Sequence, residues 1–98
     1  MTDDILKSFD DLVATLKQCR NQETDKNAIG LYNIHIDTTD KLLTKIKTDG
    51  LDQTLIETYF EQEGRNYGWS FLPNANGQIA EEAFWKLKKK LGYDKTNA

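Results

Sequence analysis

The chain has 98 residues, of which 38% are hydrophobic and 30% are charged, and its formal net charge at pH 7 is −3. This length suffices for one modest core, and the hydrophobic content excludes an intrinsically disordered chain. Six Gly and a single Pro exclude collagen-like and low-complexity sequence. We therefore expect residues 1–98 to form a single soluble globular domain.

The sequence lacks several signals that would assign a membrane, a secretory route or a metal. Its longest uninterrupted apolar runs, 12–14 and 83–85, are far shorter than the ~18 residues of a membrane-spanning helix. Residues 1–4, Met-Thr-Asp-Asp, are acidic where a targeting signal would be basic. Cys19 is the only cysteine, so no intrachain disulfide or thiolate zinc cluster forms. We expect a cytoplasmic protein with no membrane partner, no metal and no cofactor.

The first expected element is an amphipathic helix over residues 3–21. Its apolar residues recur at spacings of three and four, and these are Ile5, Phe9, Leu12, Val13, Leu16 and Cys19. Acidic residues lie at the positive end of its dipole and basic residues near its negative end. Because Cys19 belongs to the apolar stripe, we expect a buried, unreactive thiol.

Residues 25–48 fit two periodicities in their first half. One long helix would have a continuous apolar stripe formed by Ile29, Tyr32, Ile36, Leu43 and Ile46, with Leu31 and Ile34 on its flank. A period of two instead makes residues 31–36 a short strand. We favour the single helix, ended by Asp49-Gly50, because β-branched residues weaken a helix only slightly. The strand remains the alternative.

Two shorter helices are expected over residues 52–63 and 78–91. The first has a wide apolar face of Leu55, Ile56, Tyr59 and Phe60, and Gly64 follows its end. The second has a stripe of Ala80, Ala83, Phe84, Leu87 and Leu91, and Gly92 follows its end. Glutamates in its first turn and lysines in its last turn match the helix dipole.

The intervening residues, 64–77, show no helical period. Tyr67, Trp69 and Phe71 alternate instead with a period of two, which predicts an extended segment with an aromatic face. Pro73 and a turn at Asn76-Gly77 would end that segment.

The fold prediction is therefore an all-α bundle of four helices of unequal length, with an extended aromatic segment before the last helix. The alternative is an α+β fold in which residues 31–36 pair with residues 67–71 in a small two-stranded sheet.

Catalytic constellations are weak in this sequence. On a helix, Asp37 and Asp40 do not share the face of His35, so we expect a solvated or hydrogen-bonded histidine rather than a metal or acid/base site. A small enzyme that uses carboxylates such as Asp37, Asp40, Glu61 and Glu63 is a minor hypothesis. We expect no enzyme activity.

Half of the aromatic residues fall between positions 67 and 85. Trp85 lies off the apolar stripe of its helix, so it either packs under the aromatic segment as a satellite of the core or is exposed. Trp, Tyr and Arg are the residue types enriched at interface hot spots. The candidate partner-binding residues are Arg65, Tyr67, Trp69, Phe71 and Trp85.

These features favour a non-enzymatic protein–protein interaction module, monomeric or homodimeric, whose partner is another protein. By analogy of fold and charge alone, it could be a small acidic inhibitor, an immunity-type protein or an antitoxin-type protein. The alternative is nucleic-acid or phosphate-ligand binding through Lys86, Lys88, Lys89 and Lys90. The net negative charge makes nucleic acid the less favoured partner.

Overall fold

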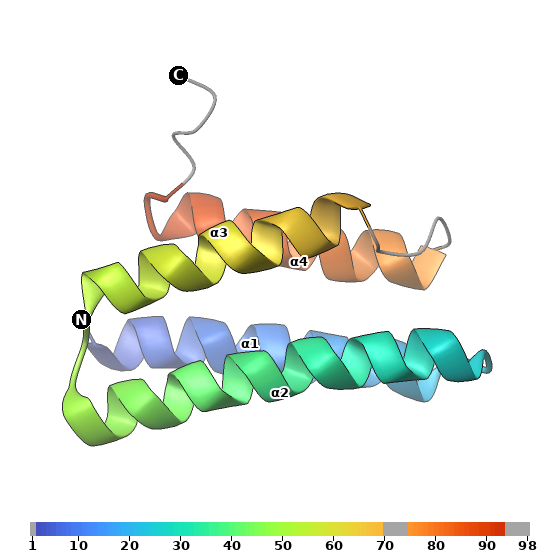
Figure 1. The fold of residues 1–98 in the computed structure, drawn as a ribbon, viewed down its shortest axis with the longest axis horizontal. Helices are drawn as coiled ribbons and strands as arrows, with labels where there is room; N and C mark the ends of the chain where they lie inside the picture. The colour runs from blue at the N-terminus through green and yellow to red at the C-terminus, as the bar shows by residue number, and fades with distance from the viewer. Residues whose placement is uncertain (1, 70–74, 94–98) are drawn as a thin grey trace.

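The computed structural model describes residues 2–69 and 75–93, with side chains described at 3–65 and 75–93. It contains the helices α1 (Thr2–Asn21), α2 (Lys26–Asp49), α3 (Gln53–Trp69) and α4 (Ala75–Lys90). The helices run alternately up and down along one axis as a bundle (Figure 1). No strand occurs in the described part of the chain, so the all-α prediction is confirmed and the two-stranded sheet is wrong.

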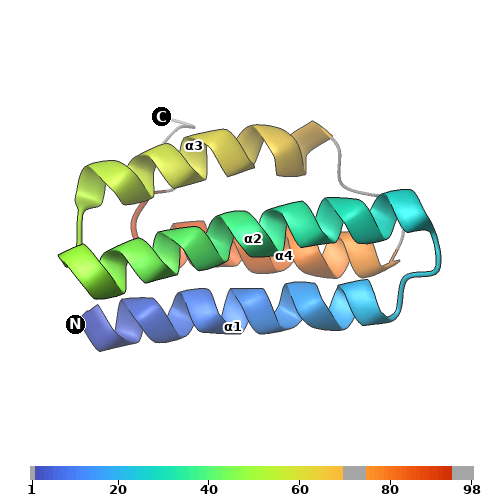
Figure 2. The ribbon, with the colours of Figure 1, turned by 60° about the horizontal axis from the view of Figure 1, so that its bottom comes forward.

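The helices are arranged so that α1 packs closely against α2 and α4, and α3 completes the bundle on the other side of these two (Figure 2). Helices α1 and α3 therefore lie diagonally opposite each other. Aromatic rings fill the space between them: Phe9 of α1 lies 6.0 Å from Phe60 and 5.5 Å from Tyr59, centroid to centroid. Phe84 of α4 joins this cluster at 5.7 Å from Phe60.

Most helix ends follow local signals. The Asp25 side chain accepts a hydrogen bond from the backbone N–H of Asn27, and Asp52 accepts one from the N–H of Thr54, so each aspartate caps the helix that follows it. Gly50 has φ of 93° and Gly92 has φ of 82°, a conformation that other residues adopt at a cost. These glycines follow α2 and α4, as the sequence predicted.

The long-helix interpretation of residues 25–48 is confirmed, because α2 is helical throughout 31–36. Tyr32, Ile36, Leu43 and Ile46 face the core. Ile34 is 58% exposed, as expected for a residue on the flank of the stripe. A strand at 31–36 would need a neighbouring strand to pair with, whereas these residues instead pack as part of a helix against the other helices.

The expected boundaries of the last two helices are wrong. Helix α3 does not end before Gly64 but continues to Trp69, and α4 begins at Ala75, so Asn76-Gly77 lies in its first turn rather than in a separate turn. Gly64 does not have the positive φ of a helix-ending glycine. The predicted extended segment is therefore helical at 64–69 and 75–77, and Phe71 lies outside the described residues.

Candidate functional site

Trp85 is the candidate residue whose surroundings the structure describes most fully. It projects from α4 toward α3, where a Cβ atom at position 64 would stand 3.6 Å from its Cη2 atom. The indole thus lies close to Gly64 of α3, and it also packs against the core and lies edge-on to Phe84 at 5.0 Å. The indole is half-buried. One side of the Trp85 indole therefore packs against the core, and the other side is exposed at the surface.

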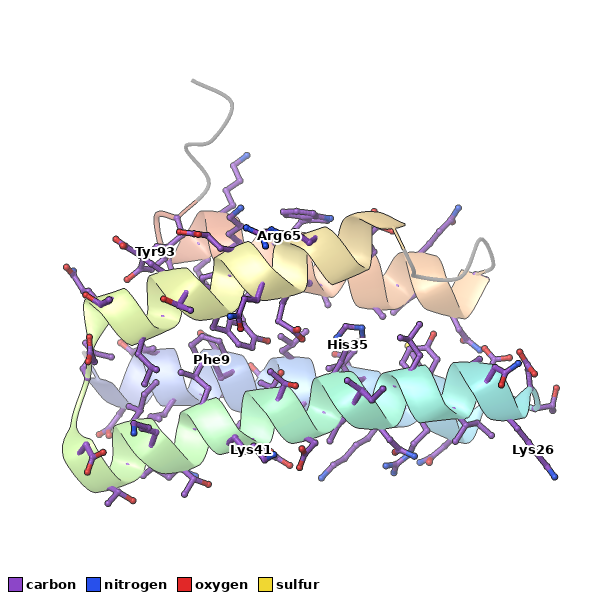
Figure 3. The ribbon with its side chains drawn as sticks, viewed as in Figure 1. Phe9, Lys26, His35, Lys41, Arg65 and Tyr93 are labelled. Carbon is purple, nitrogen blue, oxygen red and sulfur yellow. The ribbon has the colours of Figure 1, made fainter. Side chains whose placement is uncertain are left out.

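Arg65 lies next to this contact and is exposed, on the side of α3 that faces away from α2 (Figure 3). Tyr67 and Trp69 belong to the last turns of α3, so their backbone follows Arg65 on the same helix. Their side chains and the whole of Phe71 lie outside what the structure describes. Of the five candidate partner-binding residues, Arg65 and Trp85 are thus described at neighbouring positions of α3 and α4.

The four candidate phosphate-binding lysines point to different environments. Lys88 is buried, and its Nζ atom lies 5.0 Å from the centroid of the Trp85 ring, a cation–π contact. Lys89 is exposed, whereas Lys86 and Lys90 line a groove between α4 and α1. Lys90 donates a hydrogen bond from Nζ to Oγ of Ser8 at 2.9 Å. The fold brings Lys86 and Lys90 together and separates them from Lys88.

That groove, here called the α1–α4 groove, has a volume of about 540 Å³. The two helices that line it, α1 and α4, lie behind α2 and α3 in Figure 1. Apolar side chains line much of it, and these are Leu12, Ile79, Ala83 and Leu87. Ile79 is 52% exposed there. The sequence did not predict this groove. One signal for it was Ile79, a large apolar residue of α4 that does not belong to the apolar stripe.

A buried polar contact joins α2 and α3. His35 Nδ1 lies 2.8 Å from Glu63 Oε1, and both side chains are buried in the interior between the two helices (Figure 3). Of the two predicted states, solvated or hydrogen-bonded, the structure shows the hydrogen-bonded one, and the partner is Glu63. Glu63 lies one turn beyond Tyr59 and Phe60, on the same face of α3, which is the signal that could have indicated its burial.

A second polar contact lies one turn further along α2. Thr39 Oγ1 donates to the backbone carbonyl of His35 at 2.8 Å and lies 2.8 Å from the Tyr59 hydroxyl. Burial raises the pKa of Tyr59; the hydrogen bond between Tyr59 and Thr39 lowers it and the nearby Glu63 carboxyl raises it. A neutral, hydrogen-bonded Tyr59 is therefore part of the core at neutral pH.

Cys19 is buried, as predicted, and its Sγ atom donates to the backbone carbonyl of Asn76 at 3.4 Å. Burial raises the pKa of this thiol, and the nearby Glu23 carboxyl raises it further. A raised pKa keeps the thiol protonated, and the thiolate is the nucleophilic form. Cys19 is thus a packing residue that ties α1 to the first turn of α4.

Across the described ranges, no group of three or more His, Cys, Asp or Glu side chains is placed to hold a metal ion. None of the helices in those ranges combines the length and apolarity that a membrane span requires. No protein-family model, curated protein or solved structure matches the chain.

Proposed function

We propose that this protein is a non-enzymatic protein–protein interaction module. Its partner would bind the Trp85 surface, which comprises Arg65, Tyr67, Trp69, Phe71 and Trp85. The observation that carries the proposal is the half-buried indole of Trp85, which contacts Phe84 and Lys88 and lies close to Gly64 of α3. An aromatic ring that is already ordered loses little conformational entropy when a partner covers its exposed part.

Arg65 supports the same proposal. Its exposed guanidinium lies beside the position where α3 contacts Trp85, and it can form paired hydrogen bonds to a carboxylate or stack on an aromatic ring of the partner. An aromatic side chain beside an arginine is a common hot-spot combination.

The chemistry of the partner follows from charge. A net charge of −3 favours association with a basic protein, which suits a small acidic inhibitor, an immunity-type protein or an antitoxin-type protein. We place this function in the cytoplasm, where the lone thiol of Cys19 stays reduced.

Phosphate binding through Lys86, Lys88, Lys89 and Lys90 is the weaker proposal. A phosphate site needs cations that converge on one point, whereas Lys88 lies over Trp85 and away from the α1–α4 groove that Lys86 and Lys90 line. Binding to a DNA or RNA duplex that falls steeply with salt would revive it; no binding at low salt would dismiss it.

The experiment is affinity capture from the native host, followed by measurement of the dissociation constant with the purified partner. Arg65→Glu and Trp69→Ala alter the Trp85 surface, and Lys26→Glu makes a charge change matched to Arg65→Glu at the first residue of α2, where Lys26 is exposed (Figure 3). We expect each variant of the surface to weaken binding about tenfold or more, which corresponds to ~1.4 kcal/mol, and Lys26→Glu to leave it unchanged.

A partner that binds all three variants equally well would contradict the proposed surface. Fluorescence supplies an independent check, because acrylamide quenches exposed tryptophans and not shielded ones. Two fully shielded tryptophans in the free protein would exclude the Trp85 surface as a binding site.

A further inference from the structure

The α1–α4 groove lies apart from the Trp85 surface. On the wheel of α4, Trp85 points about 120° away from the centre of the face formed by Ile79, Ala83 and Lys86. The groove face turns toward α1, whereas Trp85 turns toward Gly64 of α3. The two surfaces can therefore be occupied and mutated independently.

We propose that the α1–α4 groove receives one amphipathic helix of another protein. Along α4 the groove extends from Ile79 to Lys90, a length of about 16 Å, which matches roughly three helical turns. The small side chain of Ala83 lies between Ile79 and Leu87 and permits close approach of a helix at the middle of the groove. Helix-in-groove recognition uses apolar anchors at i, i+3 or i+4, and i+7, and the groove offers an apolar surface of that length.

The charges along the groove have a direction. Lys86 and Lys90 make one end positive, beside Ser8 of α1. Glu82 makes the other end negative, near Ile79. Asp11 lies on the α1 side, where Lys7 pairs with it at 3.5 Å and balances its charge.

Charge complementarity therefore defines the chemistry of the bound helix. It carries Asp or Glu at the end that lies over Lys86 and Lys90, Lys or Arg at the end that lies over Glu82, and apolar residues between them. The Lys90 ammonium already donates to the Ser8 hydroxyl, and a carboxylate of the incoming helix would provide a stronger, charge-assisted acceptor.

Shape favours a helix of a partner over a second copy of this chain. Two copies would bring two concave surfaces face to face and leave space between them, whereas a single helix is convex and fills one groove.

Two synthetic helical peptides of about 14 residues test the proposal. Both carry the same leucine stripe; the bipolar peptide has glutamates at one end and lysines at the other, and the all-basic peptide has lysines at both ends. We expect the bipolar peptide to shift the amide resonances of Thr15, Ile79, Ala83 and Leu87 in a ¹⁵N-labelled sample. Its affinity should exceed that of the all-basic peptide about tenfold.

The double variant Lys86→Glu/Lys90→Glu makes the groove acidic and should reverse the preference between the two peptides. Lys89→Glu changes the charge of α4 outside the groove and should leave the preference unchanged. Ala83→Arg should abolish binding of the bipolar peptide by filling the groove, provided that circular dichroism shows an intact bundle.

Four results would overturn the proposal. The first is a set of shifted amides that lies outside the groove, and the second is a preference that the double lysine variant does not alter. The third is a change of the groove amide resonances when the protein concentration is raised without peptide, together with a doubling of the sedimenting mass. The groove would then be occupied by a second copy of this chain. The fourth is a dissociation constant weaker than about 1 mM for both peptides.

Discussion

His35 and Glu63 meet inside the bundle, with Nδ1 of the histidine 2.8 Å from Oε1 of the glutamate. The residues are 28 positions apart, and their side chains are 1% and 3% exposed. The contact between Thr39 and Tyr59 is a second buried polar contact between α2 and α3. Removing one partner of such a pair costs more than replacing both, because a buried polar group then loses its partner.

Glu63→Leu should lower the free energy of unfolding by about 3 kcal/mol, because it removes the carboxylate that His35 contacts in the interior. Urea denaturation at pH 7 measures this change. Glu61→Leu is the matched control, because Glu61 is exposed on the same helix and should change stability by no more than ~0.5 kcal/mol.

The double variant His35→Leu/Glu63→Leu should recover much of the stability lost in Glu63→Leu, since neither member of this contact then remains buried opposite an apolar side chain. The coupling between the two sites should be about 1–3 kcal/mol. If the loss of stability in the double variant equalled the sum of the losses in the two single variants, the contact between His35 and Glu63 would contribute no coupling energy.

Thr39→Val should destabilise the protein by about 1–3 kcal/mol, because it keeps the shape of the side chain and removes the hydrogen bond to the Tyr59 hydroxyl. Thr39→Val/Tyr59→Phe should be closer to the wild type than Thr39→Val is. Thr44→Val, at an exposed position of α2, is the control for valine in a helix. Thermal denaturation that ranks Thr44→Val as the more harmful change would refute the role of this contact.

Stability should fall as pH rises above about 10. Burial is the largest of the effects that raise the pKa of Tyr32 to about 12, and the nearby Cys19 thiol and Glu23 carboxyl contribute the rest. Unfolded tyrosines release their protons near pH 10, whereas the folded protein retains them, so the unfolded state binds fewer protons in this range and gains stability. Each such tyrosine adds a slope of up to about 1.4 kcal/mol per pH unit.

Tyr32→Phe should therefore flatten the decrease in unfolding free energy measured by urea denaturation between pH 9 and 11.5. Tyr59→Phe should act in the same direction, because burial raises the pKa of Tyr59 as well. A slope that neither variant changes would mean that both hydroxyls titrate at their ordinary pKa.

Gly30→Ala and Gly50→Ala should have opposite effects on the melting temperature. Neither position has an atom within 4 Å of an added Cβ, so a steric clash cannot account for a difference between the two variants. Gly30 lies within α2, where alanine should stabilise by about 1 kcal/mol. Gly50 has φ of 93°, where alanine should destabilise by about 1–2 kcal/mol. Two changes of the same sign would contradict the backbone conformation assigned to these glycines.

Local spacing made much of the fold predictable. The stripe of α1, the continuous stripe of α2 and the helix ends at Gly50 and Gly92 all depend on residues a few positions apart, whose geometry the helix itself sets. The candidate residue Trp85 was also found this way, because its position off the stripe is visible without any tertiary contact.

The sequence by itself determined which residues share a helix face, where two of the helices end, and that α2 is long and carries Ile34 on its exposed flank. Only the tertiary structure decided that α3 continues past Gly64, because glycine is compatible with a helix interior as well as a helix end, and Gly64 does not adopt the positive φ of an end. It also decided that His35 meets Glu63 and that Lys86 and Lys90 border a groove apart from Lys88. Helical periodicity fixes faces locally, whereas the meeting of two faces depends on packing between residues far apart in the chain.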